Sequence, residues 1–322
     1  MMEKSRQTYL KEISPDKVVR NPDNPRLFFR AEEMDTLMAS IRRSGIQVPI
    51  SVYEDDGNYV LIDGERRWRC ARKLNLQRIP AMVQQKPSPL ANLLLMFNIH
   101  MLREQWDYFT IANKLPSIIS LFSAENEGKE PTEPELAEIS GLTRGQIRHC
   151  RLLMDLPAEY KEKLESELSL PKHLQTLSED FFIEMERALK TVQRRVPSVV
   201  PDLNTARDAL IDKFSNGTID NITDFRKLSK IATSISNLGA KEAKVRAAIS
   251  DILNPKKKTG IKEVFAEQFE MRYDERKIGL TIDSIYEYLK GSIEGGSETI
   301  LGADLKRRLS DLKRMIERVL RS

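Results

Sequence analysis

A short segment that combines glycine with arginine carries the clearest chemical signal in the sequence. Residues 61–70 read LIDGERRWRC, and Gly64 lies between an apolar, β-favouring stretch and a segment with helical spacing. Arg66, Arg67 and Arg69 therefore fall in the first turns of a helix, where the backbone already carries partial positive charge. A strand, a glycine turn and a helix N-terminus form a phosphate-binding arrangement, so a phosphate would resolve the unfavourable placement of the cations. The alternative is a solvated basic face whose arginines pair with nearby carboxylates, and composition alone does not separate the two.

The elements around this segment predict a small α+β domain. Between residues 21 and 26 the order Asn-Pro-Asp-Asn-Pro-Arg forbids a helix and predicts an extended, turn-rich loop that leaves Arg26 exposed. Apolar spacing and turn residues then predict a helix, a hairpin, a second helix and a strand. These elements cover residues 32–44, 48–62, 65–74 and 79–83. The arginine segment therefore lies between the hairpin and the last strand.

Size and composition indicate a helix-rich globular protein in a reducing compartment. The chain has 322 residues, enough for two or three domains, with 40% hydrophobic and 31% charged residues. Its formal net charge is only +4, so a nucleic-acid surface must come from local clusters. Cys70 and Cys150 form neither a disulfide framework nor a CxxC motif, and no apolar run reaches the length of a membrane span. We therefore expect a cytoplasmic protein with no membrane partner.

A basic helix after a tight turn is the second chemical signal, within residues 132–153. Two capping boxes of the Thr-x-x-Glu/Gln kind predict two short helices, and Gly141 allows a sharp turn between them. The second helix has no acid before Asp155, which is the polarity of a recognition helix in a DNA major groove. The expected DNA contacts are Thr143, Arg144, Gln146, Arg148, His149 and Arg151. The alternative is a helical hairpin with a solvated basic face.

The rest of the chain is predicted to be mostly helical. Residues 106–122 form a long amphipathic helix interrupted at Pro116, and residues 197–201 read as a linker. Breaks in the helical pattern are expected at 216–217, 254–255 and 291–296, and the run Lys256–Lys258 reads as a solvated loop that could also meet DNA phosphates. Residues 305–320 carry a near-heptad apolar stripe, which predicts a homodimer seam.

The order of motifs in the first hundred residues resembles the N-terminal domain of the ParB family. The matching motifs are Asn-Pro-Asp-Asn-Pro-Arg at 21–26, Ser-Ile-Arg-Arg-Ser-Gly at 40–45 with Pro-Ile at 49–50, Gly-Glu-Arg-Arg-Trp-Arg at 64–69 and Ile-Pro-Ala at 79–81. The resemblance implies a CTP-binding fold shared with sulfiredoxin, in which the glycine and arginine segment holds the triphosphate and the loop after residue 45 reads the cytosine. The nucleotide-binding residues implied in this way are Arg26, Gly45, Gln47, Pro49, Gly64, Glu65, Arg66, Arg67, Arg69, Asn98 and Arg103.

The segment around residue 98 departs from the family pattern. ParB-like proteins carry Glu-Asn-x-x-Arg there, but this chain has Phe97 in place of the Glu and Met101 in place of the Arg, and Val48 stands where a Gln often precedes the Pro. Asn98 is then the single candidate ligand for a Mg²⁺ ion that would accompany CTP. The missing side chains argue against nucleotide hydrolysis, and a weak CTPase activity stays open with no catalytic residue assigned.

The resemblance implies a fold class, three domains and a function. The expected fold is an α+β ParB/sulfiredoxin-like domain over 1–86, an all-α helix-turn-helix domain over 87–196 and a mostly helical region over 202–322. The expected function is a CTP-responsive, sequence-specific DNA-binding protein in plasmid or chromosome partition, with double-stranded DNA, a second copy and a ParA-type ATPase as partners. The alternatives are a transcriptional regulator or adaptor that has lost hydrolysis, and a kinase- or nuclease-like enzyme with Glu65 as base. Sulfiredoxin chemistry is disfavoured because the phosphate turn holds Glu65 and no cysteine.

Overall fold

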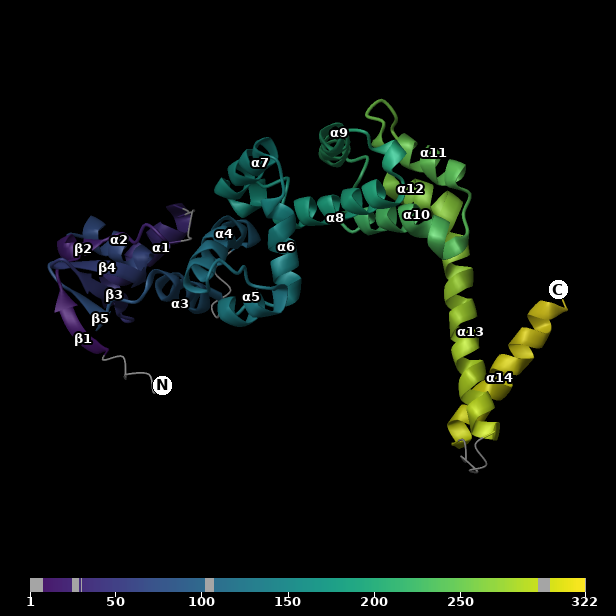
Figure 1. The fold of residues 1–322 in the computed structure, drawn as a ribbon, viewed down its shortest axis with the longest axis horizontal. Helices are drawn as coiled ribbons and strands as arrows, with labels where there is room; N and C mark the ends of the chain where they lie inside the picture. Colours follow the sequence, from purple (N-terminus) through teal and green to yellow (C-terminus); the bar gives the residue numbers. More distant parts are fainter. Residues whose placement is uncertain (1–7, 25–28, 30, 102–106, 295–301, 322) are drawn as a thin grey trace.

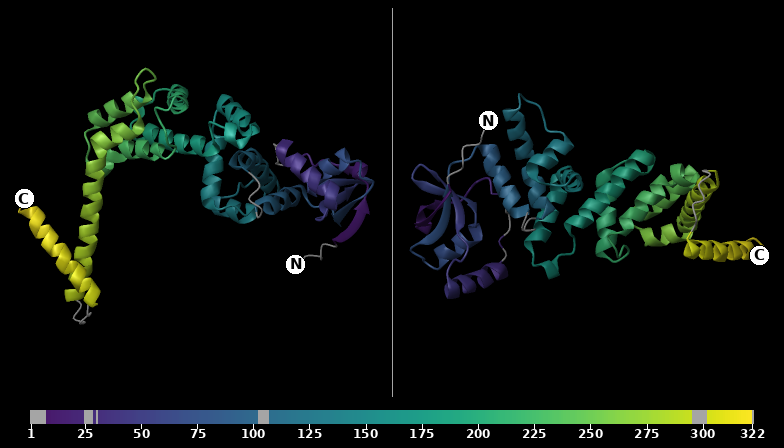
Figure 2. Two further views of the ribbon diagram at one scale, coloured as in Figure 1. Left: turned by 180° about the vertical axis from the view of Figure 1, so that it is seen from behind. Right: turned by 90° about the horizontal axis from the view of Figure 1, so that it is seen from below.

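The computed structural model describes residues 8–24, 29, 31–101, 107–294 and 302–321, and the side chains of 98–101 and 293–294 are outside this description. Within it, the chain forms a sheet domain followed by helices (Figure 1). The sheet domain lies at one end of an elongated molecule, and the last two helices lie at the other end (Figures 1 and 2). The predicted fold class, an α+β domain followed by helices, is confirmed.

The N-terminal domain is built on a mixed sheet of five strands. The strands are β1 (Tyr9–Ile13), β2 (Val18–Val19), β3 (Ile50–Asp55), β4 (Asn58–Asp63) and β5 (Ile79–Gln84), in the order β1-β5-β3-β4-β2. β3 pairs antiparallel with β4 and parallel with β5. The hairpin turns at Asp56 and Gly57, which both have positive φ (47° and 79°), as the Asp-Gly turn signal predicted.

Period-two alternation along the strands gives the sheet two buried faces. Leu61 and its neighbours on one face pack against Trp68 and Ala71 of helix α2 (Glu65–Lys73). Val60 and Ile62 on the opposite face join the core that contains Leu93 of α3 (Pro89–Met101). The sheet therefore fixes α2 at the end of β4, with α1 (Ala31–Ser44) packed beside α2.

Helices make up the remainder of the described chain. They are α4 (Tyr108–Glu125), α5 (Glu133–Ser140), α6 (Arg144–Met154), α7 (Ala158–Ser169), α8 (Glu179–Arg195), α9 (Leu203–Ser215), α10 (Asp224–Leu238), α11 (Glu242–Leu253), α12 (Ile261–Phe265), α13 (Met271–Glu294) and α14 (Ala303–Leu320). Short 3₁₀ turns lie at Pro15–Lys17, Lys172–Leu174 and Pro197–Val199, and a π-helical turn at Ala266–Glu270 joins α12 to α13.

Two predicted helix breaks differ from the structure. α4 runs through Pro116 without interruption, although proline cannot donate a backbone hydrogen bond there. α13 likewise continues through Gly291 to Glu294, so the first four residues of the predicted break at 291–296 are helical, and the last two lie outside the described residues. A single proline or glycine costs a helix a limited amount of free energy, which a long helix can tolerate.

The helical core is continuous from the sheet domain to Phe269. Residues on both sides of the predicted boundary at 196 belong to one buried cluster, in which α8 packs along α10. The extent of this cluster shows how the helix-turn-helix region and the following helices are held together. The domain limits 1–86, 87–196 and 202–322 stay a prediction.

Candidate functional site

The turn before α2 has a geometry that only glycine satisfies. Gly64 lies in the left-handed region with φ = 98°, and a Cβ there would come within 2.7 Å of the Ile50 side chain. The chain thus changes from β4 to α2 in one residue, and the first turn of α2 presents Glu65, Arg66 and Arg67. The predicted strand, glycine turn and helix N-terminus are present.

Arg67 connects the helix start to the loop after α1. Its Nη1 donates to the carbonyl oxygens of Val48 (2.6 Å) and Pro49 (2.9 Å), and its Nη2 donates to Oδ2 of Asp63 (2.8 Å). Pro49 and Gly45, both predicted nucleotide contacts, therefore belong to the loop that this guanidinium holds; Gly45 ends α1 with φ = 69°. The side chain of Arg67 is 15% exposed, so the fork is largely enclosed.

Glu65 is a buried carboxylate that organises the opposite side of the turn. It accepts hydrogen bonds from Asn24 Nδ2 (2.5 Å) and from Nε and Nη2 of Arg69 (2.9 and 2.6 Å). Arg20 Nε lies 3.3 Å from the same carboxylate. With these donors around it and only 4% of the residue exposed, Glu65 is engaged as an ion-pair partner. This arrangement argues against Glu65 as the base of an enzyme.

All three arginines of the segment have a carboxylate partner. Arg66 Nη2 lies 3.4 Å from Oε2 of Glu33 and donates to the Glu33 carbonyl (3.2 Å). With the Arg67–Asp63 and Arg69–Glu65 pairs, this is the carboxylate pairing that the sequence left open as an alternative to phosphate. These pairs compensate the positive helix end in this structure. A nucleotide would have to compete with at least some of them.

A basic cavity of about 690 Å³ lies beside α2, on its α1 side. Its volume is in the range of small-molecule sites. Its lining residues are Arg20, Phe29, Ala31, Met34, Asp35, Trp68, Arg69, Arg72 and Lys73. Four cations and one acid give the cavity a positive balance, and Arg69 stacks over the Phe29 ring with its Cζ 4.0 Å from the centroid. The room for an anionic ligand is therefore next to Arg69, along α2, and Gly64 does not line it.

Sequence reasoning did not assign Arg20, Asn24 or Arg72 to this site. Arg72 follows Arg69 at i+3, a helical spacing that could have identified it. Arg20 and Asn24 reach Glu65 from a loop more than forty positions earlier, and no local pattern predicts such a contact.

The structure describes only some of the remaining residues that were predicted to contact the nucleotide or a metal. Arg26 and Arg103 lie outside the described residues, and Asn98 lies in α3 with its side chain outside the description. Phe97, where the family pattern has a carboxylate, is completely buried in the helical core. Gln47 donates to the Ser44 carbonyl at the end of α1. Among the described residues, no three His, Cys, Asp or Glu side chains are grouped to hold a metal.

α5 and α6 are two short helices joined by a tight turn, and their N-terminal caps follow the sequence prediction. Thr132 and Glu135 make a reciprocal capping box at α5, and Thr143 and Gln146 make another at α6. Gly141 ends α5 in the left-handed region with φ = 73°. The apolar contacts that fix the angle between the helices are fully buried: Leu136, Leu142, Ile147, Cys150 and Leu153.

The outer face of α6 carries the predicted cations. Arg144, Arg148 and Arg151 are exposed at i, i+4 and i+7, and Thr143 is exposed at the N-cap. Gln146 is half-buried, because its Oε1 accepts from the Thr143 backbone in the capping box (2.8 Å). Glu133 of α5 lies beside this face: Arg144 Nε donates to it at 2.9 Å, and this bond keeps the pKa of the Glu133 carboxyl below its ordinary value.

His149 is turned away from this face. Its Nε2 lies 2.9 Å from Nη2 of Arg187, and Tyr108 packs edge-on at 5.4 Å between ring centroids. Because a guanidinium can only donate, Nε2 accepts and the proton resides on Nδ1, which is buried without a hydrogen-bond partner. Burial, and then the charge of Arg187, lower the pKa of His149 below its ordinary value. His149 was predicted to contact DNA; in the structure its ring orients Arg187 of α8.

The fold and these two sites define a class: a small α+β domain with an arginine-lined helix start, joined to a helical region that presents a basic helix-turn-helix. Residues 1–98 match the family model of the ParB N-terminal domain. The first 98 residues are therefore similar to the N-terminal domain of the ParB family. None of the helices in the described ranges has both the length and the apolarity that crossing a membrane requires.

Two curated relatives illustrate the similarity. The nucleoid occlusion protein of Geobacillus sp. (strain WCH70) is 29% identical over 194 residues, covering 60% of this chain and 65% of the relative. The chromosome-partitioning protein ParB of Caulobacter vibrioides is 31% identical over 150 residues, covering 46% of this chain and 47% of the relative. The chain therefore spans between about half and two thirds of the length of these relatives.

Two solved structures of C-terminally truncated ParB from Caulobacter crescentus are also similar. The complex with CTP-gamma-S has 28% identity, covers 51% of this chain and 89% of that chain, and has a TM-score of 0.29. The complex with the centromeric parS site has 20% identity, covers 74% of this chain and 97% of that chain, and has a TM-score of 0.38.

Proposed function

We propose that this chain is a CTP-responsive, sequence-specific DNA-binding protein that acts in plasmid or chromosome partition at the nucleoid. The observation that carries this proposal is the combination in one chain of a ParB N-terminal domain with an exposed cationic face on α6. Its proposed partners are double-stranded DNA, a second copy of the chain and a ParA-type ATPase. A relative that is similar in sequence, ParB of Caulobacter, supports DNA and CTP as ligand classes through its complexes with parS and CTP-gamma-S.

In this proposal the α2 region holds the nucleotide. Arg66, Arg67 and Arg69 supply charge-assisted hydrogen bonds to phosphate oxygens, and the glycine turn lets the backbone approach. Of these residues, Arg69 lines the α2 cavity, whose other cations, Arg20, Arg72 and Lys73, fit a phosphate-bearing ligand. A Mg²⁺ ion fits less well, because Glu33, Asp63 and Glu65 already pair with arginine and Phe97 replaces the family carboxylate. We therefore assign nucleotide binding to this site and no hydrolytic step.

Isothermal titration with CTP tests the nucleotide assignment. We expect wild-type protein to bind CTP and Arg67→Ala to weaken binding by at least about tenfold, because a charge-assisted hydrogen bond contributes roughly 1.5 to 3 kcal/mol. Arg66→Ala is the second variant: its partner Glu33 is 41% exposed, so this change leaves no buried carboxylate unpaired. Arg246→Ala on α11 is the control, since Arg246 pairs only loosely with Glu242 (4.0 Å) far along the chain. Unchanged CTP affinity in both α2 variants would refute the assignment.

A second candidate function is an adaptor that has lost its nucleotide. The observation that favours it is the complete pairing of the three arginines with carboxylates, together with the buried Phe97. The same titration decides between the two, because an adaptor gives no CTP-dependent heat in wild-type protein. Turnover of ATP or CTP with DNA present would instead favour an enzyme.

Fluorescence anisotropy with duplex DNA tests the second half of the proposal. Arg148→Ala should weaken binding, because Arg148 is 64% exposed on the face that would enter the major groove. At a base-contacting position the expected loss is about 1 to 3 kcal/mol, or roughly tenfold to a hundredfold. Arg246→Ala again serves as the control. Equal affinities of wild type and Arg148→Ala at moderate salt would contradict the role of α6.

A further inference from the structure

A second basic cavity, of about 490 Å³, lies between α6 and α8. Its lining residues are Gly145, Arg148, His149, Arg151, Leu152, Arg187 and Lys190. Five of these seven are basic residue types, and no carboxylate is among them. Two cations come from the recognition helix candidate and two from α8, so the cavity joins two elements that are far apart in sequence.

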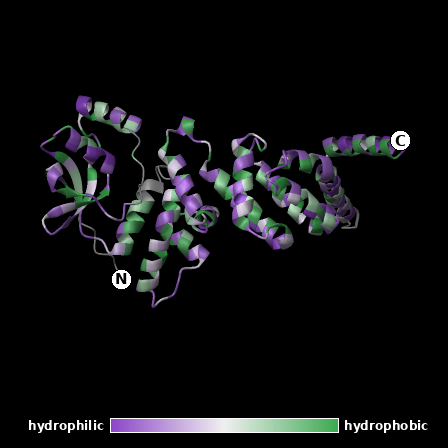
Figure 3. Ribbon diagram, turned by 90° about the horizontal axis from the view of Figure 1, so that it is seen from above, coloured by the Kyte–Doolittle hydropathy of each residue, from purple (hydrophilic) through white to green (hydrophobic). Residues whose placement is uncertain are grey.

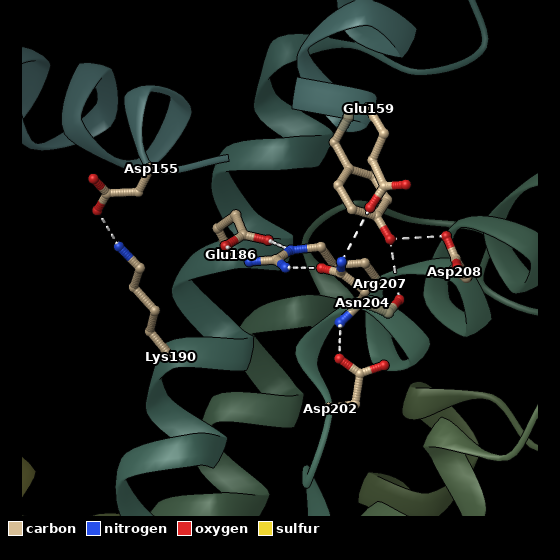
Figure 4. A network of polar contacts seen from close by, with 9 residues as sticks. Asp155, Glu159, Glu186, Lys190, Asp202, Asn204, Arg207 and Asp208 are labelled. Carbon is tan, nitrogen blue, oxygen red and sulfur yellow. Dashed lines mark hydrogen bonds and ion pairs between the residues drawn. The ribbon is translucent and has the colours of Figure 1, made fainter. Parts of the chain in front are cut away.

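The cations of α8 are held by carboxylates that lie outside the cavity. Lys190 Nζ donates to Oδ2 of Asp155 at 2.6 Å, across the end of α6 (Figure 4). The Asp155 side chain is 59% exposed, so this surface pair is weak and can exchange for a stronger anion. Arg187 Nη1 donates to Glu184 at 2.9 Å, but Arg226 of α10 shares that carboxylate at the same distance. One carboxylate between two arginines leaves net positive charge beside the cavity.

His149 fixes the direction of Arg187. The contact between Nε2 and Nη2 ties the guanidinium to the α6 wall, and Thr191 Oγ1 donates to the Arg187 carbonyl one turn along α8. Lys190 and Arg194 are exposed at the next positions of the same α8 stripe, at i+3 and i+7 from Arg187. The positive surface of α6 therefore continues along α8.

We propose that the cavity between α6 and α8 is a seat for a phosphate of the DNA backbone, and that α8 is a second DNA-contacting element. This inference rests on the proposed DNA binding by α6. Arg187 and Lys190 reach the phosphate from α8, and Arg151 reaches it from α6. Late positions of a recognition helix meet backbone phosphates, which brings a phosphate to the mouth of this cavity. The contact positions the duplex and carries no sequence information of its own.

The salt dependence of DNA binding tests the phosphate seat. Each phosphate contact adds about 0.9 to the slope of log K against log [salt], whatever the sequence of the duplex. The test is to measure, by anisotropy, the affinity of the protein for a random-sequence duplex and for a selected site between about 50 and 200 mM salt. Lys190→Gln and Arg187→Gln should each lower the slope by about 0.9 and weaken both duplexes by a similar factor.

Two matched controls exist in the chain. Lys86→Gln removes a lysine that pairs with Asp55 (2.7 Å) and is 58% exposed, as Lys190 pairs with Asp155 and is 43% exposed. Arg246→Gln removes an arginine of α11 that is 50% exposed and pairs with Glu242, away from the cavity. Both controls should keep the wild-type slope. Equal melting temperatures of variants and controls show that the fold is intact.

Four outcomes overturn the inference. A wild-type slope in both α8 variants shows that α8 does not meet the duplex while DNA binding by α6 stands. An equal loss of slope in the controls shows a general charge effect. Millimolar inorganic phosphate could stabilise wild type but not Lys190→Gln, while both proteins keep the same salt-dependence slope for DNA binding. This result would assign the seat to a free phosphate compound. Absence of any DNA binding by wild type removes both this inference and the proposed function of α6.

Discussion

The carboxylate partners of the three α2 arginines differ in how easily they can be released. Asp63 and Glu65 have side chains that are 8% and 3% exposed, so removing their arginines would leave a buried charge unpaired. Glu33 is 41% exposed, and its pair with Arg66 is of the surface kind that contributes little to stability. A phosphate group would therefore displace Glu33 from Arg66 at the lowest cost. Arg67 and Arg69 can bind phosphate only through N–H groups that are not already bonded to Asp63 and Glu65.

The ionisation of a second single residue, Glu179, predicts how the free energy of unfolding depends on pH. This carboxyl at the start of α8 accepts from the Phe109 backbone, and burial and the nearby Asp107 raise its pKa from about 4.5 to about 7. The folded state then binds a proton more tightly than the unfolded state, so stability from this group is lost as pH rises from about 5 to about 8. Glu179→Gln should remove this loss and raise the free energy of unfolding at pH 8, relative to wild type, by about 1 to 3 kcal/mol.

Urea denaturation at both pH values measures this difference. At pH 5 the two proteins should differ less, because Glu179 is then mostly protonated. Glu165→Gln, on the exposed face of α7, is the control for the charge change. A difference between wild type and Glu179→Gln that is the same at both pH values would exclude the raised pKa.

At the scale of elements, the two capping boxes allow one comparison that separates stability from DNA binding. Thr132→Ala and Thr143→Ala remove equivalent caps from α5 and α6, and each should cost about 1 kcal/mol in the free energy of unfolding. Only Thr143 lies at the start of the proposed recognition helix, so only Thr143→Ala should also weaken DNA binding. Denaturation and anisotropy on both variants give the result. Equal DNA affinities for the two would place the duplex away from the α6 N-terminus.

Local sequence patterns predicted helices, turns and caps better than the side-chain contacts between distant elements. The hairpin turn at Asp56 and Gly57 and both capping boxes involve residues within four positions of each other, and they form as expected. The partners of His149 and Glu65 come from Arg187 and Asn24, which lie 38 and 41 positions away. Such contacts depend on how whole elements pack, so the approach of Asn24 to Glu65 and the inward turn of His149 could not be predicted from local spacing. Pro116 shows the converse: packing maintained a helix where the local pattern predicted a break.

At the scale of the molecule, charged and apolar surfaces are distributed unevenly. The continuous core ends at Phe269, and beyond it α13 runs away from α10–α12 while α14 diverges from α13 (Figures 1 and 2). Hydrophobic and hydrophilic residues alternate along α14 at the end of the molecule (Figure 3). No described residue of α14 is buried, and an isolated helix of this length is marginal in water, so we expect α14 to have a partner.

The spacing of apolar residues on α14 predicts what that partner is. Leu305, Leu309, Leu312, Ile316 and Val319 follow the 4-3-4-3 spacing of a coiled-coil seam. Leu312 and Ile316 are each 43% exposed, so the middle of the stripe is accessible to a second chain in the part of the molecule that the structure describes. We expect a second copy to cover it, which makes the protein a dimer with two DNA-binding faces. Leu312→Ala should weaken dimerisation at least about tenfold, because a buried Leu→Ala change costs roughly 2 to 5 kcal/mol.

Sedimentation equilibrium over a range of concentrations measures the dimer constant. Arg307→Ala is the matched control, because Arg307 lies on the face of α14 opposite the seam and pairs with Asp304 of the same helix. Both changes introduce alanine, which favours the helix, so a difference between them reports the seam and not helix propensity. A dimer would also bind two half-sites with one set of contacts each, so Leu312→Ala should reduce affinity for a two-fold symmetric duplex more than for a half-site. A monomeric wild type, or a Leu312→Ala dimer as tight as wild type, would assign the exposed seam to another partner.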